Sequence, residues 1–215
     1  MQALWYNYRM VITWYGLSSF KIASGSLTLI TDPFSASVGL LAPRGGADIV
    51  VVSNRENPAY NNATPLGDEK TFVADGAGEY DVKGLFIHGG IGGNGATIYA
   101  IRMEDIRLGF LGALKTKEMT EAQLADLGEV DILFVPVGGH TVCDAEEASK
   151  IVSQVEPTIV IPMHFAQKGL KMQLDKVETF QKEMSSKTEP QDKLTIKRSE
   201  LAPDGTKVIV LNPQR

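Results

Sequence analysis

The sequence predicts an α/β protein with two sheets that are faced by helices. Short strand-like segments separated by glycine and serine fill most of the first half of the chain, whereas helix signals concentrate in the second half. Two near-continuous apolar runs, 132–137 and 158–162, are typical of strands that are covered on both faces. With 215 residues, of which 43% are hydrophobic, the chain is long enough for one domain around one core.

The first half is expected to be mainly sheet. Gly16 and the run 24–26 have the composition of tight turns between strands. The glycine-rich run 89–95 is predicted as a flexible hairpin loop, since no P-loop lysine follows it. The expected strands of this half are residues 11–15, 20–23, 27–31, 49–53, 71–74, 85–87, 97–103 and 106–111.

Three helices are expected in the second half. Thr120 followed by Gln123 is a capping-box pattern, and the helix that it starts should end at Gly128. Asp144 with Glu147 repeats the pattern for a helix that ends before Pro157. A third apolar stripe at helical spacing covers residues 174–184, and strand segments follow at 194–196 and 207–211.

Composition excludes several classes of partner. The net charge is -5 and the basic residues are spread along the chain, so the sequence predicts neither nucleic-acid binding nor attraction to an anionic membrane surface. No apolar run approaches the ~20 residues that a spanning helix needs. The single cysteine, Cys143, forms no internal disulfide, which favours a cytoplasmic location. A buried thiol is its expected state, and a nucleophilic Cys143 paired with His164 is the alternative.

The N-terminal residues differ in composition from the rest of the chain. Residues 1–9 contain Trp5, Tyr6 and Tyr8 and are predicted as an N-terminal extension, followed by one domain over residues 10–215. The extension is either a peripheral arm or an aromatic arm that docks on another subunit.

Polar residues follow the two buried strands of the second half. Gly138 to Thr141 follows the first strand, and His164 follows the second. Ligands bind outside the carboxyl ends of strands in layered α/β proteins, so these residues are expected to line one cleft.

Several blocks of the sequence together resemble the metallo-β-lactamase superfamily, especially its lactonase-like branch. They are the Gly16 to Phe20 turn, the Thr31 to Phe34 segment, Gly78 to Tyr80, and the late blocks Val135 to Gly139 and Ile161 to Phe165. Their order and separation extend the resemblance over residues 10–211. The resemblance implies a four-layer αββα sandwich with mixed sheets, and it makes a homo-oligomer reasonable.

The resemblance also implies two metal ions, yet the residues that would hold them are largely replaced. In the family, histidines and an aspartate follow an early strand, whereas the matching positions after Ser53 are Asn54, Glu56, Pro58 and Ala59. Only Glu56 among these four offers a carboxylate.

Later ligand positions of the family show the same trend. Ala113 stands where the family has a bridging aspartate, and Leu17 stands where a histidine is common. His164 matches the last ligand histidine, although a ring bonded to a backbone carbonyl is the plainer interpretation of this residue. Capping is expected to be the whole role of Asp144, and Asp32 is expected to anchor a turn.

These replacements favour a non-catalytic protein with a binding, regulatory or assembly role, without a cofactor and without catalytic residues. The alternative is a metal-dependent hydrolase of small esters, lactones or phosphodiesters that recruits zinc or another divalent ion. The metal would be held by His164, Glu56, His140 and Asp144. A third outcome is a small-molecule ligand that binds unchanged. The candidate cleft-lining residues are Ser53, Asn54, Glu56, His140, Thr141, Asp144 and His164.

Overall fold

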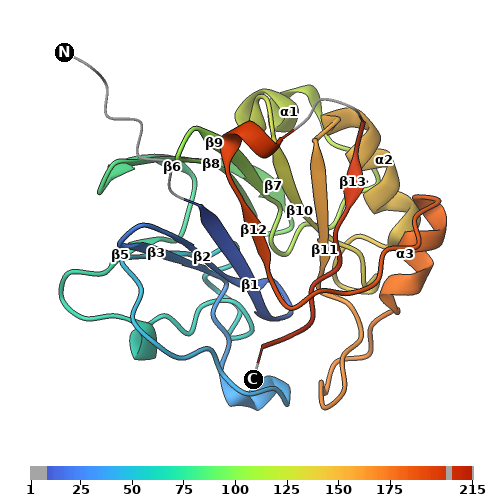
Figure 1. Cartoon of the computed structure of the whole chain (residues 1–215). Helices are drawn as coiled ribbons and strands as arrows, with labels where there is room; N and C mark the ends of the chain where they lie inside the picture. Colours follow the sequence, from blue (N-terminus) through green and yellow to red (C-terminus); the bar gives the residue numbers. More distant parts are fainter. Residues whose placement is uncertain (1–8, 202–204, 215) are drawn as a thin grey trace.

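The computed structural model describes residues 9–201 and 205–214, which form two β-sheets packed face to face together with three α-helices (Figure 1). One sheet has six strands in the order β12-β1-β2-β3-β4-β5, and the other has seven in the order β13-β11-β10-β9-β8-β7-β6. Both sheets contain parallel and antiparallel pairs. The predicted α/β protein with two mixed sheets is therefore confirmed. Residues 1–8 lie outside the described residues, so the domain boundary at residue 10 stays a prediction.

The element bounds follow the predicted order. The six-stranded sheet consists of β1 (Met10–Gly16), β2 (Ser19–Ser24), β3 (Leu27–Thr31), β4 (Ile49–Val51), β5 (Phe72–Ala74) and β12 (Leu194–Ile196). The seven-stranded sheet consists of β6 (Gly78–Val82), β7 (Leu85–Gly93), β8 (Ala96–Met103), β9 (Ile106–Phe110), β10 (Ile132–Pro136), β11 (Ile159–Met163) and β13 (Lys207–Val208). The helices are α1 (Glu121–Leu127), α2 (Ala145–Val155) and α3 (Val177–Glu183), with short 3-10 turns η1 (Ala36–Val38), η2 (Thr64–Leu66) and η3 (Arg198–Glu200).

The main core lies between the two sheets. Phe20 of the six-stranded sheet and Phe134 of the seven-stranded sheet are 4.7 Å apart between ring centroids, and Trp14 and Phe165 are 4.6 Å apart. Every residue of β10 and of β11 is buried, as the continuous apolar runs predict. In β1, buried and half-buried residues alternate, which is the pattern of a strand with one face against the core.

The helices begin where the sequence predicts in two cases and later in the third. Thr120 and Asp144 each form the expected capping box, and α1 ends at the predicted Gly128. The third helix begins at Val177, not at Leu174, because the backbone of Lys176 before it is extended, with ψ of 151°. Leu174 is buried in the preceding loop. Helix α1 packs against β7 and β8, α2 against β10, and α3 against α2. Among the described residues, no helix combines the length and the apolar character that crossing a membrane requires.

The prediction of a hairpin loop over residues 89–95 is wrong, because β7 continues to Gly93 and only Asn94 and Gly95 form the turn. Close packing explains Gly89 and Gly90 of this strand, whereas Gly93 has a left-handed backbone beside the turn. A Cβ atom at Gly89 would lie 2.6 Å from the Gly76 carbonyl oxygen, and one at Gly90 would overlap the Asp126 carboxylate. The glycines therefore permit close approach of neighbouring elements, and the sequence signal was mistaken for a turn. Strand β6 was not predicted.

We expect Asp131→Ala to lower the free energy of unfolding by about 2–3 kcal/mol, because it leaves two arginines without a nearly buried partner. Asp131 accepts hydrogen bonds from Arg107 and lies 2.6 Å from the Arg198 guanidinium. Burial alone would raise the pKa of Asp131, and these bonds more than offset that effect and lower it. Urea unfolding at pH 7 measures the loss. Asp105→Asn is the control, since Asp105 pairs with Arg102 at the surface and asparagine tolerates its left-handed backbone.

Candidate functional site

The carboxyl ends of β3, β4, β9 and β11 meet at one edge of the structure. Asp32 follows β3, Ser53 lies two residues after β4, and His164 follows β11. The backbone N–H of Ala113, after β9, donates to the Ser53 hydroxyl at 3.1 Å, which joins the two sheets at this edge. Ligand sites in layered α/β proteins form at such strand ends.

Asp32 and Ser53 are joined by two hydrogen bonds at this edge of the structure. The Ser53 N–H donates to Asp32 Oδ1 at 2.6 Å, and the Ser53 hydroxyl lies 2.6 Å from Asp32 Oδ2. Asp32 is completely buried, and burial raises the pKa of its carboxyl to about 8, although the hydrogen bonds from Ser53 act in the opposite direction. Asp32 is therefore more than the turn anchor that the sequence predicts.

His164 is also completely buried, and one of its ring nitrogens lacks a partner. Its Nδ1 lies 3.3 Å from the Ser18 hydroxyl, so the prediction that the ring bonds a backbone carbonyl is wrong. Within the described residues, Nε2 is buried without a hydrogen bond. Burial lowers the pKa of His164 to about 4, which leaves the ring neutral at pH 7. The left-handed backbone at His164, with φ of 55°, places the ring at the strand end.

Tyr60 lies close to both the Asp32–Ser53 pair and the His164–Ser18 pair. Its ring lies nearly parallel to that of His164, with an angle of 11° and a centroid distance of 5.7 Å. Burial, followed by the nearby charge of Asp32, raises the pKa of the Tyr60 hydroxyl. We call Ser18, Asp32, Ser53, Tyr60 and His164 the buried polar cluster. Sequence reasoning missed Ser18 and Tyr60, and their only signal was proximity along the chain to turns at strand ends.

The other predicted cleft residues lie outside this cluster. Glu56 is on the surface with its side chain 86% exposed, and it pairs with Arg55 at 3.3 Å. The Asn54 side chain accepts a hydrogen bond from the Glu56 N–H. His140 and Thr141 are exposed in the loop after β10.

Asp144 acts in helix capping, as predicted. Its Oδ1 accepts the Glu147 N–H at 2.9 Å, and Glu147 accepts the Asp144 N–H at 3.0 Å. Cys143, beside it, is buried, and burial raises the pKa of its thiol to about 11. A protonated thiol is a poor nucleophile, so the structure favours the buried-thiol interpretation.

The donors that the structure describes do not fit a resident metal ion. Over residues 9–201 and 205–214, no three histidine, cysteine, aspartate or glutamate side chains are grouped so that they could hold one. His164 offers one free nitrogen, while both oxygens of Asp32 are engaged by Ser53. Catalytic zinc sites use about three protein ligands. The four residues proposed from sequence, Glu56, His140, Asp144 and His164, therefore do not form a common site in this conformation.

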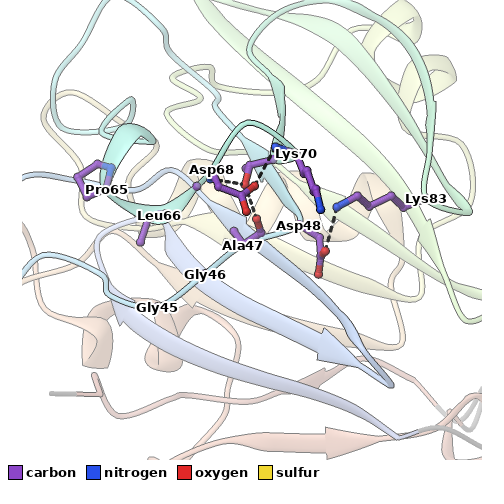
Figure 2. Close-up of a pocket in the computed structure, with 11 residues that line it drawn as sticks. Gly45, Gly46, Ala47, Asp48, Pro65, Leu66, Asp68, Lys70 and Lys83 are labelled. Carbon is purple, nitrogen blue, oxygen red and sulfur yellow. Dashed lines mark hydrogen bonds and ion pairs between the residues drawn. The ribbon is translucent and has the colours of Figure 1, made fainter.

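A surface groove of about 590 Å³ lies at the opposite end of β4 (Figure 2). Asp48 and Lys83 line it and form an ion pair at 2.9 Å, while Asp68 accepts the Lys70 N–H within a turn. These polar groups satisfy one another locally. Asp48 precedes β4 and Ser53 follows it, so the groove is separate from the buried polar cluster.

Comparison with known proteins identifies relatives over most of the chain. The pattern described as "Beta-lactamase superfamily domain" matches residues 11–164. A Thermotoga maritima structure named as a Zn-dependent hydrolase of the metallo-β-lactamase superfamily is 31% identical, with a TM-score of 0.79, and the match covers 94% of this chain and 98% of that one. A UPF0173 protein of Pyrococcus abyssi is 25% identical over 74% of this chain and 85% of its own length. A UPF0173 metal-dependent hydrolase of Methanoculleus marisnigri is 27% identical over 73% and 81%.

These relatives correct two predictions. The favoured interpretation of a non-catalytic protein is contradicted, because the relatives carry the names of metal-dependent and Zn-dependent hydrolases. The prediction that no cofactor is used is contradicted by the same names, which imply a divalent metal. The replaced residues at Asn54, Pro58, Ala59 and Ala113 led to both errors, since loss of the family's ligands was taken as loss of its chemistry.

The resemblance seen in the sequence is confirmed by the matched domain, by the two mixed sheets and by the Thermotoga structure. The chain belongs to the β-lactamase superfamily and has the metallo-β-lactamase fold.

Proposed function

We propose that the protein is a hydrolase of small esters, lactones or phosphodiesters that acts at the buried polar cluster. The observation that carries the proposal is the unpartnered Nε2 of His164 at the carboxyl end of β11. A buried nitrogen without a partner is rare in native structures and is common where a protein binds a ligand or reacts with one. The names of the relatives support hydrolysis as the reaction class.

The residues of the cluster suit proton transfer. His164 is neutral at pH 7 because burial lowers its pKa to about 4. In the tautomer that donates Nδ1–H to the Ser18 hydroxyl, Nε2 accepts a proton or a hydrogen bond. Asp32 is largely protonated at that pH because burial raises its pKa to about 8. Two groups whose pKa values are moved apart in this way serve as a base and an acid in one site. Tyr60 lies over one face of the His164 ring and Nε2 is buried, so substrate reaches Nε2 only when the residues that cover it move.

The names of the relatives extend the proposal to a divalent ion. Among the described residues of the cluster, His164 Nε2 is the one buried atom that is free to act as a metal ligand. A single protein ligand does not retain a divalent ion. A cytoplasmic location, which the single cysteine favours, belongs to the same proposal.

The test is hydrolysis of p-nitrophenyl acetate, γ-butyrolactone and bis-p-nitrophenyl phosphate, with chelator-treated protein and with added Zn²⁺ or Mn²⁺. We expect turnover of at least one substrate and its loss in His164→Asn, because asparagine retains a polar atom for Ser18 but removes Nε2. His140→Asn is the matched control, since His140 is exposed and has a left-handed backbone that asparagine tolerates. Absence of turnover under every metal condition, or equal turnover in the two variants, contradicts the proposal.

A further inference from the structure

A pocket of about 450 Å³ opens at the edge of the structure where β3 and β11 end, the edge that also holds the buried polar cluster. Residues 39–41, directly after η1, and residues 167–169, in the loop after β11, line it. Figure 1 shows these two segments, in light blue and orange, at the lower edge of the molecule. The Lys171 N–H donates to the Val38 carbonyl oxygen at 2.9 Å, which joins the segments. Pockets of this size bind small molecules.

Apolar side chains form most of the pocket wall. Tyr15 of β1, Leu40, Leu41 and Pro213 all line it. Leu41 is 63% exposed, so a large apolar side chain faces water at the rim. Tyr15 and Leu40 also pack against the apolar cluster that contains Tyr60, which stacks on the His164 ring. An aliphatic chain suits this wall, because its binding would remove apolar surface from water on both sides.

The Gln167 side chain gives the pocket a polar end. Its Nε2 is buried and has no hydrogen-bond partner among the described residues, a state that native proteins usually resolve with water, an ion or a ligand. A Cβ atom at Gly16 would lie 2.7 Å from Leu40 Cδ1 and 2.9 Å from Gln167 Oε1, so Leu40 and the Gln167 amide meet beside this glycine. A ligand that displaces the half-buried Leu40 side chain therefore reaches the amide.

Lys168 adds a positive charge next to Gln167. Its side chain is exposed, and it is the one charged residue among the described residues that line the pocket. An amide N–H and an ammonium group are both hydrogen-bond donors, and a carboxylate offers an oxygen to each of them. This end of the pocket therefore favours an oxygen-bearing group, with a preference for an anion over a cation.

Leu17 connects Gln167 with the buried polar cluster. The Leu17 N–H donates to Gln167 Oε1 at 3.2 Å, and the Leu17 carbonyl oxygen accepts the His164 N–H at 3.0 Å. Four buried side-chain atoms lack a partner in the part of the chain that the structure describes, and the two nitrogens among them are His164 Nε2 and Gln167 Nε2. The pocket is therefore a neighbour of the proposed reaction site.

We propose that this pocket binds the acyl part of the substrate, an unbranched aliphatic chain that ends in a carbonyl group, and that Gln167 determines this specificity. The apolar wall holds the chain, Gln167 Nε2 donates to the acyl oxygen, and Lys168 attracts the carboxylate product. In hydrolysis the bond between the acyl carbon and the alcohol oxygen breaks. Water supplies the hydroxyl group of the acid and the proton of the alcohol, and the acid then loses a proton to solvent.

The substrates are thus aliphatic esters and lactones, and phosphodiesters are excluded. The inference rests on the hydrolase proposal for its reaction, whereas binding of the product requires no turnover. Isothermal titration at pH 7 with acetate, butanoate, hexanoate and octanoate therefore tests the pocket by itself. We expect the affinity to rise roughly two- to fourfold for each added CH₂ group. Octylammonium, with the same chain length and the opposite charge, should bind at least about tenfold more weakly than octanoate.

Gln167→Glu tests the polar end of the pocket. Glutamate keeps an oxygen for the Leu17 N–H but replaces the Nε2 donor with a negative oxygen, so octanoate affinity should fall about tenfold or more. Gln173→Glu is the matched control, since Gln173 is exposed on the same loop and the change in charge is identical. Leu41→Ser tests the wall at an exposed position that folding tolerates, and it should reduce the gain in affinity per CH₂ group.

The titrations and the ester assays together separate the two proposals. Equal affinity for all chain lengths, equal affinity for octylammonium and octanoate, or an equal effect of Gln167→Glu and Gln173→Glu overturns the pocket assignment. Octanoate binding as expected without turnover of p-nitrophenyl acetate or octanoate supports the pocket and contradicts the hydrolase. Turnover with the same kcat/KM for both esters, or faster turnover of bis-p-nitrophenyl phosphate, overturns the acyl specificity and leaves the hydrolase in place.

Discussion

Gly112→Ala is expected to lower the free energy of unfolding by roughly 2–5 kcal/mol, the sum of backbone strain and steric overlap. Gly112 has a φ of +51°, and a Cβ atom there would overlap Ser53 Cβ and lie 3.3 Å from Asp32 Oδ2. Ser53 has little room to move, because Asp32 and Ala113 hold its backbone and its hydroxyl. The substitution therefore disrupts the buried polar cluster directly. Urea unfolding at pH 7 measures the effect.

Alanine substitutions at Gly45 and Gly46 separate the cost of backbone strain from the cost of steric overlap. Gly45 has a φ of +100°, and no atom lies within 4 Å of the position that a Cβ atom would take, so Gly45→Ala reports strain alone, about 1–2 kcal/mol. Gly46 has equal space and no left-handed φ, so Gly46→Ala should change stability by less than about 0.5 kcal/mol. If Gly112→Ala costs no more than Gly45→Ala, the tight contact with Ser53 is not a feature of the protein.

The fold was predictable from the sequence because its signals are local. The apolar runs of β10 and β11 and the capping boxes at Thr120 and Asp144 each depend on residues a few positions apart. The glycines of β7 were wrongly predicted to form a loop, because the contacts that require them come from residues distant in the sequence. Gly90 is required by Asp126 of α1, a partner distant in the sequence, and composition alone cannot distinguish that need from a turn.

The site was predictable only in part, because burial and pairing arise from long-range contacts. His164 was identified from its position after a buried strand, and Ser53 from its position at the end of the expected strand 49–53. Asp32 was not, since its raised pKa depends on enclosure by segments that lie far from it in the sequence. Glu56 had the right chemistry for a ligand, yet its loop carries it to the surface. Function was the least predictable property, because the relatives' names contradict a conclusion drawn from missing ligands.

The stability of the protein is expected to fall by up to about 1.4 kcal/mol per pH unit as the pH rises from 6.5 to 8, and to change little between pH 4 and 6.5. The loss of stability above pH 6.5 comes from Asp32, whose pKa is raised from 3.8 to about 8. Between these values the folded state holds a proton that the unfolded state has released. Stability therefore decreases with pH throughout that range.

His164 acts in the opposite direction over the acidic half of the range. Its pKa is lowered from 6.5 to about 4, so between these values the unfolded state binds a proton that the folded state does not. Its contribution to stability thus increases with pH from 4 to 6.5 and is constant above that. The effects of Asp32 and His164 cancel below pH 6.5, and that of Asp32 alone remains above it.

Asp32→Asn and His164→Asn separate the two contributions, and urea unfolding at intervals from pH 4 to 9 measures them. In Asp32→Asn, which is close in shape to the protonated carboxyl, stability should rise from pH 4 to 6.5 and then stay level. In His164→Asn it should fall over the whole range from 4 to 8. Asp48 and Asp131, whose pKa values are lowered, change stability only as the pH falls below about 4, so both variants share that loss. A curve for Asp32→Asn that runs parallel to that of the unmodified protein would mean that Asp32 is already ionised in the folded state at neutral pH. In that case the carboxyl has access to water or to a cation, and the buried polar cluster is more open than its hydrogen bonds indicate.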